Sequence, residues 1–246
     1  MTLIFLPMKL KIFSENLWIY ESELDLTKGI LPLIPPKFFG RPTIRMCIIK
    51  KETGGLILYS PVKMDQQVIS EINNLGPVDL ILGSNIFHNT YLLETCKNFK
   101  SAKCLIAPKT AKRNPLVGEL QEWDDTLNLD SNMISPYIMK GNIMNELFLF
   151  HKPTKTLVLT DFLSDMTYGG NLFEQLYSFC VGMYKKIGVP FYQKYNIKDK
   201  KAFKASLQEV LKLDFDKIIL SHGKCIESNG KEILATSWDK ILRKVK

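Results

Sequence analysis

Short apolar runs alternate with polar and glycine-rich turns along the chain, and their spacing predicts both strands and helices. Runs at 43–50 and 56–60 flank the turn Glu52-Thr53-Gly54-Gly55, which predicts a β-hairpin because glycine accepts the positive φ of such turns. A Pro-rich connector at 31–42 excludes regular helix and central strand before this hairpin. The elements predicted next are a helix at 64–75 that ends at Gly76-Pro77, a strand at 78–82, a helix at 89–99 and a strand at 104–107.

The middle of the chain changes character. Three strand-like runs at 133–139, 146–151 and 156–161 are separated only by short turns, which predicts a meander of neighbouring strands. A helix is expected to open at Asn171, a good N-cap with Glu174 three residues later. The last predicted elements are a helix at 200–212, a strand at 216–221 and a helix at 230–245.

This order of elements limits the possible folds. It fits a four-layer αββα sandwich, in which two sheets pack face to face and helices cover the outside. It also fits an irregular α/β fold with a single mixed sheet. With 246 residues, 46% of them hydrophobic, the chain can bury a sizeable core, so we expect one domain over residues 1–246.

The formal charge of +8 is concentrated in one segment. Residues 185–204 hold seven lysines against one aspartate, or +6 of the +8. No nucleic-acid reading element accompanies this charge, so we expect no nucleic-acid partner. The segment is interpreted as a solvated lysine-rich surface, with a weak contact to an anionic surface as the alternative, because Phe191, Tyr192 and Tyr195 lie between the lysines.

Hydropathy and cysteine usage bear on localisation. The longest apolar stretch, 172–187, is interrupted by charged residues and is shorter than the ~20 residues of a membrane-spanning helix, so we expect no span. The apolar residues 3–6 precede Lys9 and Lys11 and lack a small-residue cleavage site, which argues against a signal peptide. Five widely spaced cysteines without a C-x-x-C pair predict reduced thiols and no zinc held by cysteine. Together these features predict a cytoplasmic protein.

The candidate chemistry lies at predicted strand ends. Asp161 and His222 each follow a short apolar strand, where a carboxylate or an imidazole is costly to bury unless it is paired or bound to a metal. We expect His222 to be a buried, neutral imidazole that is hydrogen-bonded to Asp161 without a metal, although Asp161 could instead cap a local turn. His88, in the loop after the strand at 78–82, is either a surface residue or a catalytic acid or base that faces Asp161. His151 lies at the other end of its strand and is expected to be structural or exposed.

Several motifs resemble one known family. The run Thr156-Leu157-Val158-Leu159-Thr160-Asp161 is similar to the strand-Asp motif of metallo-β-lactamase-like proteins, and Ile218-Ile219-Leu220-Ser221-His222-Gly223 is similar to their final strand-His-Gly motif. Further motifs resemble an uncharacterised branch of that superfamily, a domain of unknown function: Ser60-Pro61, Leu75-Gly76-Pro77-Val78, Asn85-Ile86-Phe87-His88 and Phe150-His151-Lys152-Pro153. The resemblance covers about residues 9–240 and implies the αββα fold. It also implies that the aspartate bridges two metals and that the last histidine binds one of them.

The metal motifs of that superfamily are depleted in this chain. The stretch that corresponds to His-x-His-x-Asp-His runs from Asn85 to Thr90 and lacks three histidines and the aspartate. The histidine of the usual Pro-Gly-His turn corresponds to Asn142. Two remaining ligands do not complete a four-coordinate zinc site, so we expect no tightly bound cofactor.

Two hypotheses of function follow. The first is a fold that has lost the dinuclear zinc chemistry and acts as a cytosolic binding or scaffold protein for a small molecule or a protein. The alternative is a metal-dependent hydrolase whose catalytic residues and metal ligands are His88, Asp161 and His222, with Glu146 as a fourth ligand and with zinc or iron as the metal.

Overall fold

Two central β-sheets organise the chain in the computed structural model, which describes residues 9–23, 43–167 and 172–245. The predicted connector at 31–42 and the helix start at Asn171 lie outside these residues. The first sheet has seven strands in sequence order: β1 (Lys11–Ser14), β2 (Leu17–Glu23), β3 (Thr43–Lys50), β4 (Leu56–Tyr59), β5 (Val78–Leu82), β6 (Lys103–Ile106) and β7 (Gln121–Glu122). The second has four, in the order β13 (Lys217–Ile219), β10 (Thr156–Val158), β9 (Leu147–His151) and β8 (Ile134–Ile138). A small pair, β11 (Ser164–Asp165) and β12 (Ile187–Gly188), stands apart from both sheets.

Local sequence explains how each sheet is built. In the first sheet β3 and β4 form the predicted antiparallel hairpin, with Gly54 at φ 88° in its turn. Strands β4, β5 and β6 then run parallel, which requires helical crossovers. In the second sheet β8, β9 and β10 form the predicted antiparallel meander, and β13 adds in parallel beside β10.

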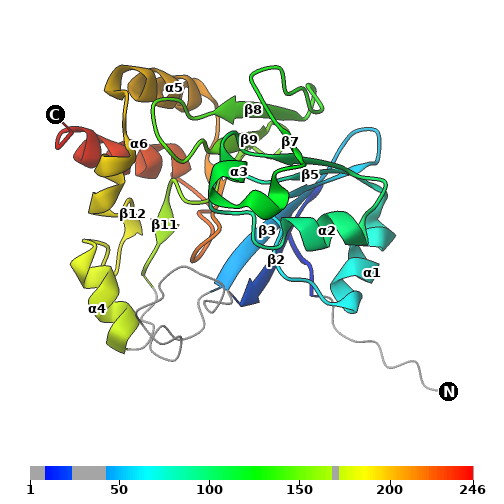
Figure 1. Cartoon of the computed structure of the whole chain (residues 1–246). Coiled ribbons are helices and arrows are strands. Elements are labelled where there is room, and N and C mark those ends of the chain that lie inside the picture. The colour runs from blue at the N-terminus through cyan, green and yellow to red at the C-terminus, as the bar shows by residue number, and fades with distance from the viewer. Residues whose placement is uncertain (1–8, 24–42, 168–171, 246) are drawn as a thin grey trace.

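The helices are α1 (Gln66–Leu75), α2 (Leu92–Asn98), α3 (Thr110–Arg113), α4 (Leu172–Cys180), α5 (Lys200–Lys212) and α6 (Gly230–Leu242), with 3₁₀ turns η3 (Pro115–Val117) and η4 (Phe191–Asn196). Helices α1 and α2 pack on the outer face of the first sheet and α5 and α6 on that of the second, whereas α4 lies to one side (Figure 1). Helix α1 begins where the Asp65 side chain accepts a hydrogen bond from the Val68 amide. No helix in the described ranges is long and apolar enough to cross a membrane.

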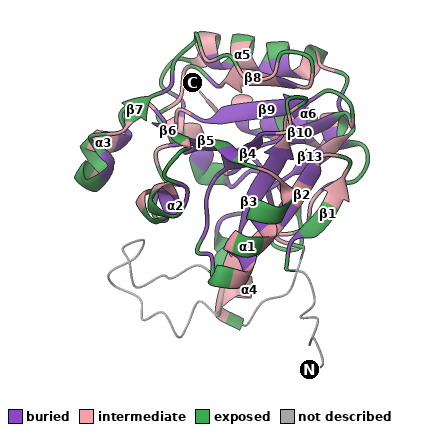
Figure 2. Ribbon diagram, turned by 90° about the vertical axis from the view of Figure 1, so that its right-hand side faces the viewer, coloured by how far each residue is buried: buried purple, intermediate pink, exposed green. Residues whose placement is uncertain are grey.

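Three hydrophobic clusters define four layers. Apolar side chains of both sheets, among them Ile57, Leu149 and Val158, meet in a central cluster. A second cluster joins the first sheet to α1 and α2, and a third joins the second sheet to α5 and α6. Figure 2 shows the buried strands at the centre and the exposed helix surfaces outside. The αββα prediction is therefore confirmed, and the alternative of a single mixed sheet is wrong.

The cysteine prediction needs a correction. Cys96, near the end of α2, and Cys104, in β6, form a disulfide, so the interpretation of all five cysteines as reduced thiols is wrong for this pair. The chain between them turns back on itself, which brings two cysteines eight residues apart within bonding reach. Cys47, Cys180 and Cys225 remain free thiols.

His151, at the end of β9, should make the stability of the fold decrease at low pH. Its side chain is buried, its Nδ1 contacts the Thr154 hydroxyl and its Nε2 has no partner, so the structural role expected from the sequence is confirmed. Burial lowers the pKa of His151 from 6.5 to about 4. Between pH 6.5 and 4 the His151 side chain is therefore protonated in the unfolded chain and neutral in the folded chain. The free energy of unfolding should fall by on the order of 2 kcal/mol as pH drops through this range.

The variant His151→Leu removes this titration and also the unpartnered nitrogen. We expect its urea-unfolding free energy to decline less than that of the parent between pH 6.5 and 4, with the two proteins compared at each pH. Equal declines in both proteins would contradict the assignment.

Candidate metal centre

The geometry of neighbouring strands brings the candidate residues together. Val158 of β10 pairs with Ile219 of β13 in parallel register, and Asp161 and His222 each lie three residues further on. Both side chains therefore emerge at the same edge of the second sheet. His88 reaches the same point from the loop after β5 of the first sheet.

Two imidazoles converge on one carboxylate oxygen. The Nε2 atom of His88 lies 3.1 Å from Asp161 Oδ1, and the Nε2 atom of His222 lies 3.3 Å from the same oxygen. In the described part of the chain these residues form a group whose possible ligand atoms all lie within 4.8 Å of one another. The side chains of His88, Asp161 and His222 are 11%, 20% and 32% exposed, so the group opens to solvent on the His222 side.

Each imidazole is oriented through its other nitrogen. His222 Nδ1 lies 3.2 Å from the Thr43 carbonyl oxygen, which can only accept, so Nδ1 carries the proton. His88 Nδ1 lies 2.8 Å from the Ser60 hydroxyl. In both rings Nε2 is left to face Asp161, the arrangement that metal-binding histidines adopt when a partner fixes their tautomer.

Asn85 occupies the second oxygen of Asp161. Its side-chain amide donates to Asp161 Oδ2 at 2.9 Å, while its oxygen accepts the backbone amides of Phe87 and His88. Asn85 thus fixes both the carboxylate and the loop that carries His88. Oδ1 remains the oxygen of Asp161 that the two histidines share.

Glu146 lies buried beneath the site. Its oxygens accept the backbone amides of Thr160 and Asp161 at 2.7 and 3.1 Å, and Asn85 also donates to it. Burial and the nearby charge of Asp161 raise the pKa of Glu146 to about 8. The role of Glu146 as a metal ligand stays a prediction, while these contacts give it a structural role in holding the Asp161 loop.

The electrostatics of the cluster favour a charged pair. Burial alone would raise the pKa of Asp161, but the charges and hydrogen bonds of His88 and His222 outweigh burial and hold that pKa well below its usual value. Burial would lower the pKa of His222, but its hydrogen bond with Asp161 raises it instead. The distances show that Asp161 and His222 pair as expected, but the raised pKa of His222 favours a charged imidazolium over the neutral imidazole that the sequence predicted. His88 also faces Asp161, which is one of its two predicted positions.

Arg45 anchors the loop that carries His222. This guanidinium, in β3 of the first sheet, is buried and donates to the carbonyls of Leu220 and Gly223, on either side of His222. Glu21 balances its charge. Gly223 has φ 81°, and a Cβ there would collide with the Asp165 backbone oxygen, so the chain needs glycine directly after His222.

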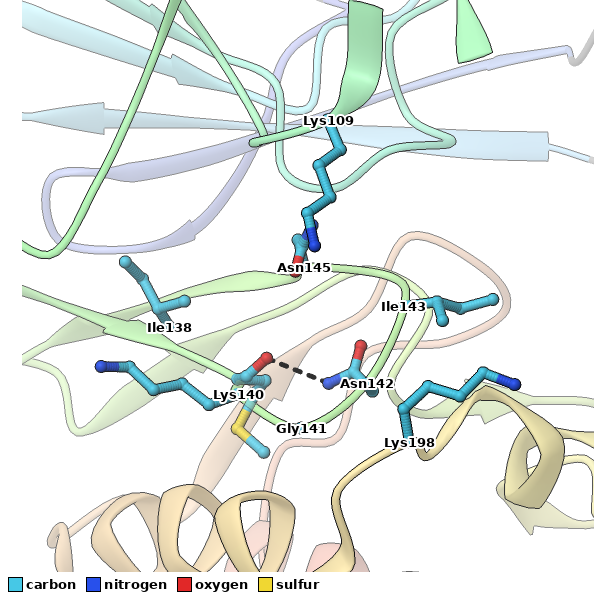
Figure 3. Close-up of a pocket in the computed structure, with 9 residues that line it drawn as sticks. Lys109, Ile138, Lys140, Gly141, Asn142, Ile143, Asn145 and Lys198 are labelled. Atoms are coloured by element: carbon cyan, nitrogen blue, oxygen red, sulfur yellow. Dashed lines mark hydrogen bonds between the residues drawn. The ribbon is translucent and has the colours of Figure 1, made fainter. Parts of the chain in front are cut away.

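The Asn142 side chain is hydrogen-bonded within its own loop, although the motif comparison aligns it with a metal-binding histidine. Its amide donates to the Met139 carbonyl (Figure 3), and its oxygen accepts the Met144 amide. It lines a separate pocket of about 390 Å³ together with Lys109, Ile138, Met139, Lys140, Gly141, Ile143, Asn145 and Lys198. Asn142 therefore shapes its own loop.

Sequence reasoning gave no role in the site to four residues that the structure places around it, namely Thr43, Arg45, Ser60 and Asn85. Arg45 interrupts an otherwise apolar strand, and an isolated charge in such a run is the signal that could have marked it. Ser60 and Asn85 gave weaker signals, since their partners lie 28 and 76 residues further along the chain.

Comparisons with known proteins identify the fold. No family model matches the sequence, and no curated protein matches it. Among solved structures, a metallo-β-lactamase from Pontibacter korlensis superposes with a TM-score of 0.59 at 12% identity, over 95% of this chain and 98% of that one. FIM-1 from Pseudomonas aeruginosa, in its mono-zinc form, gives 0.59 at 12% over 97% and 96%, and VMB-1 gives 0.64 at 12% over 97% and 98%.

This chain thus has the metallo-β-lactamase fold, as the sequence motifs implied. At this level of identity the likeness concerns the fold alone. The chemistry has to be argued from the side chains described above.

Proposed function

We propose that this protein is a metal-dependent hydrolase with a single-metal centre formed by His88, Asp161 and His222. The observation that carries the proposal is the convergence of three ligand atoms within 4.8 Å at a solvent-accessible strand edge. This hypothesis now ranks ahead of the binding or scaffold hypothesis, which rested on the depleted motif and did not include His88 as a member of the cluster.

The donor set fits a catalytic metal. Two imidazole nitrogens and one carboxylate oxygen match the three protein ligands of catalytic zinc sites, which keep a fourth position open. The same set suits ferrous iron. The hydrogen bond from His222 Nδ1 to Thr43 supports this fit, because it keeps a proton on Nδ1 and lets Nε2, once deprotonated, offer its lone pair to a metal.

Asn85 favours one metal over two. A bridging aspartate offers an oxygen to each metal, whereas here the Asn85 amide already donates to Oδ2 and only Oδ1 faces the histidines. The mono-zinc form of FIM-1 shows that a protein of this fold can be isolated with one metal.

The side chains around the centre have separable roles. When bound, a divalent cation supplies Lewis acidity, which lowers the pKa of a coordinated water and polarises a substrate carbonyl or phosphoryl oxygen. Ser60 and Thr43 hold the two rings in position, and Asp161 supplies the negative charge that balances the cation. The exposed side of His222 leaves an approach for substrate.

The direct test is elemental analysis of protein purified without chelator, followed by assays on carboxylic ester, lactone and phosphodiester substrates. We expect about one zinc or iron per chain and turnover that is lost after chelation and restored by that metal. The variant His222→Ala should lose both properties, whereas the buried His151→Leu should keep them. Metal-free parent protein, or turnover that survives chelation, would refute the proposal.

A further inference from the structure

Exposed apolar side chains gather on one part of the molecule. Of twelve large hydrophobic residues exposed in the described ranges, eight lie between 172 and 195. We call this set the α4 patch, and its members are Leu172, Leu176, Tyr177, Phe179, Tyr184, Phe191, Tyr192 and Tyr195. Soluble surfaces carry single exposed apolar residues routinely, but a contiguous group of this size marks an interaction surface.

Helix α4 presents its apolar side outward. Leu172, Leu176 and Phe179 follow one another at helical spacing and are 84%, 57% and 71% exposed. Ser178 is the helix's buried residue. A helix that only covered a core would have the opposite orientation, so this apolar face is available for something outside the described chain.

Contacts link several members of the patch. The Phe179 and Tyr184 rings meet edge to face at 6.5 Å, and the Phe191 amide donates to the Val181 carbonyl just after α4. Tyr177 hydrogen-bonds to Tyr192, which ties α4 to η4. In Figure 1 α4 lies at the lower left, away from α5 and α6.

Lysines surround these aromatic residues. The ammonium groups of Lys185 and Lys194 lie 5.3 and 4.8 Å from the ring centres of Tyr184 and Tyr195. Lys186 and Lys198 are exposed nearby in the chain. The patch therefore combines exposed apolar side chains with exposed positive charge.

We propose that the α4 patch binds the surface of an anionic lipid bilayer. Leucine and phenylalanine on one helix face, tyrosines beside them and lysines at the edge are the composition with which peripheral proteins insert side chains at the headgroup level while lysines contact anionic lipids. A second copy of the chain fits less well, because a symmetric contact would bring the two lysine groups together.

The α4 patch contains none of the three residues of the proposed metal centre. Membrane binding itself requires no metal, and the test below can therefore fail or succeed independently of the proposed hydrolase activity.

The test measures co-sedimentation of the full chain with phosphatidylcholine vesicles that contain or lack phosphatidylserine. We expect binding that requires phosphatidylserine and weakens with salt. The double variant Leu176→Asp, Phe179→Asp should lower the partition coefficient more than about tenfold. A tenfold change in partitioning corresponds to about 1.4 kcal/mol, and burial of one such side chain contributes at least that much. Lys185→Glu, Lys186→Glu should lower it about fivefold per lysine.

Matched controls exist elsewhere on the surface. Leu116 is 79% exposed and Ile12 is 73% exposed, so Leu116→Asp, Ile12→Asp makes the same chemical change away from the patch. The exposed pair Lys97→Glu, Lys100→Glu makes the same charge change. Both controls should bind as the parent does.

Three results would overturn the proposal. They are failure of the parent to bind phosphatidylserine vesicles, equal losses in the patch and control variants, and self-association in solution that the patch variant abolishes. A second readout is Phe179→Trp, whose fluorescence should be quenched by brominated lipid chains, whereas that of Leu116→Trp should not.

Discussion

Replacement of Asp161 by alanine is expected to weaken metal binding by far more than about a hundredfold and to abolish metal-dependent turnover. Asp161 supplies the oxygen that both histidines face, and loss of even an indirect partner of a metal ligand costs about ten- to a hundredfold. Its removal also leaves His88 and His222 without a balancing negative charge. Isothermal titration calorimetry with zinc measures the change in metal affinity.

The control for this experiment is Asp125→Ala. Asp125 is 68% exposed and pairs with Lys140 on the surface, so the same change there should alter neither metal binding nor turnover. Circular dichroism should show that both variants are folded. If the Asp161→Ala protein binds zinc as tightly as the parent, Asp161 is not a metal ligand.

The second large effect is expected in the aromatic cluster beneath the site. Trp238 of α6 is 1% exposed, its ring centre lies 4.1 Å from that of Phe162 and 4.8 Å from that of Phe203, and its Nε1 donates to the Phe162 carbonyl. Trp238→Ala would leave a cavity and an unpaired carbonyl. We expect the free energy of unfolding to fall by about 3–5 kcal/mol.

Trp238→Phe keeps one aromatic ring and loses the pyrrole part of the indole together with its Nε1 donor. Its loss of stability should therefore be smaller than that of the alanine variant, about 1–3 kcal/mol. Urea denaturation of both variants provides the comparison. Equal stability of the alanine variant and the parent would show that this cluster does not support the second sheet.

Elements with strong local signals were predictable from the sequence. The hairpin of β3 and β4 has glycine in its turn, and α5 spans the predicted residues because Asp199 caps its first turn. The pairing of Asp161 with His222 was also predictable, since both follow short apolar strands. In each case nearby residues determine the outcome.

Other features depend on contacts that local patterns do not encode. Strands β1 and β2 contain polar positions and were not identified individually, and their place in the sheet is set by pairing with β3. The inward position of His88 requires Ser60 and Asn85, whose approach follows from the packing of one sheet on the other. The disulfide likewise follows from the turn between α2 and β6.

The proposed metal centre spans the boundary between the two sheets. His88 belongs to the first sheet, Asp161 and His222 belong to the second, and Arg45 and Thr43 of β3 contact the His222 loop across the same boundary. A ligand held by all three side chains would act as a cross-link between the halves of the sandwich. Its binding free energy would add to the stability of the folded chain. Any change that loosened the packing of the two sheets would in turn lower the metal affinity.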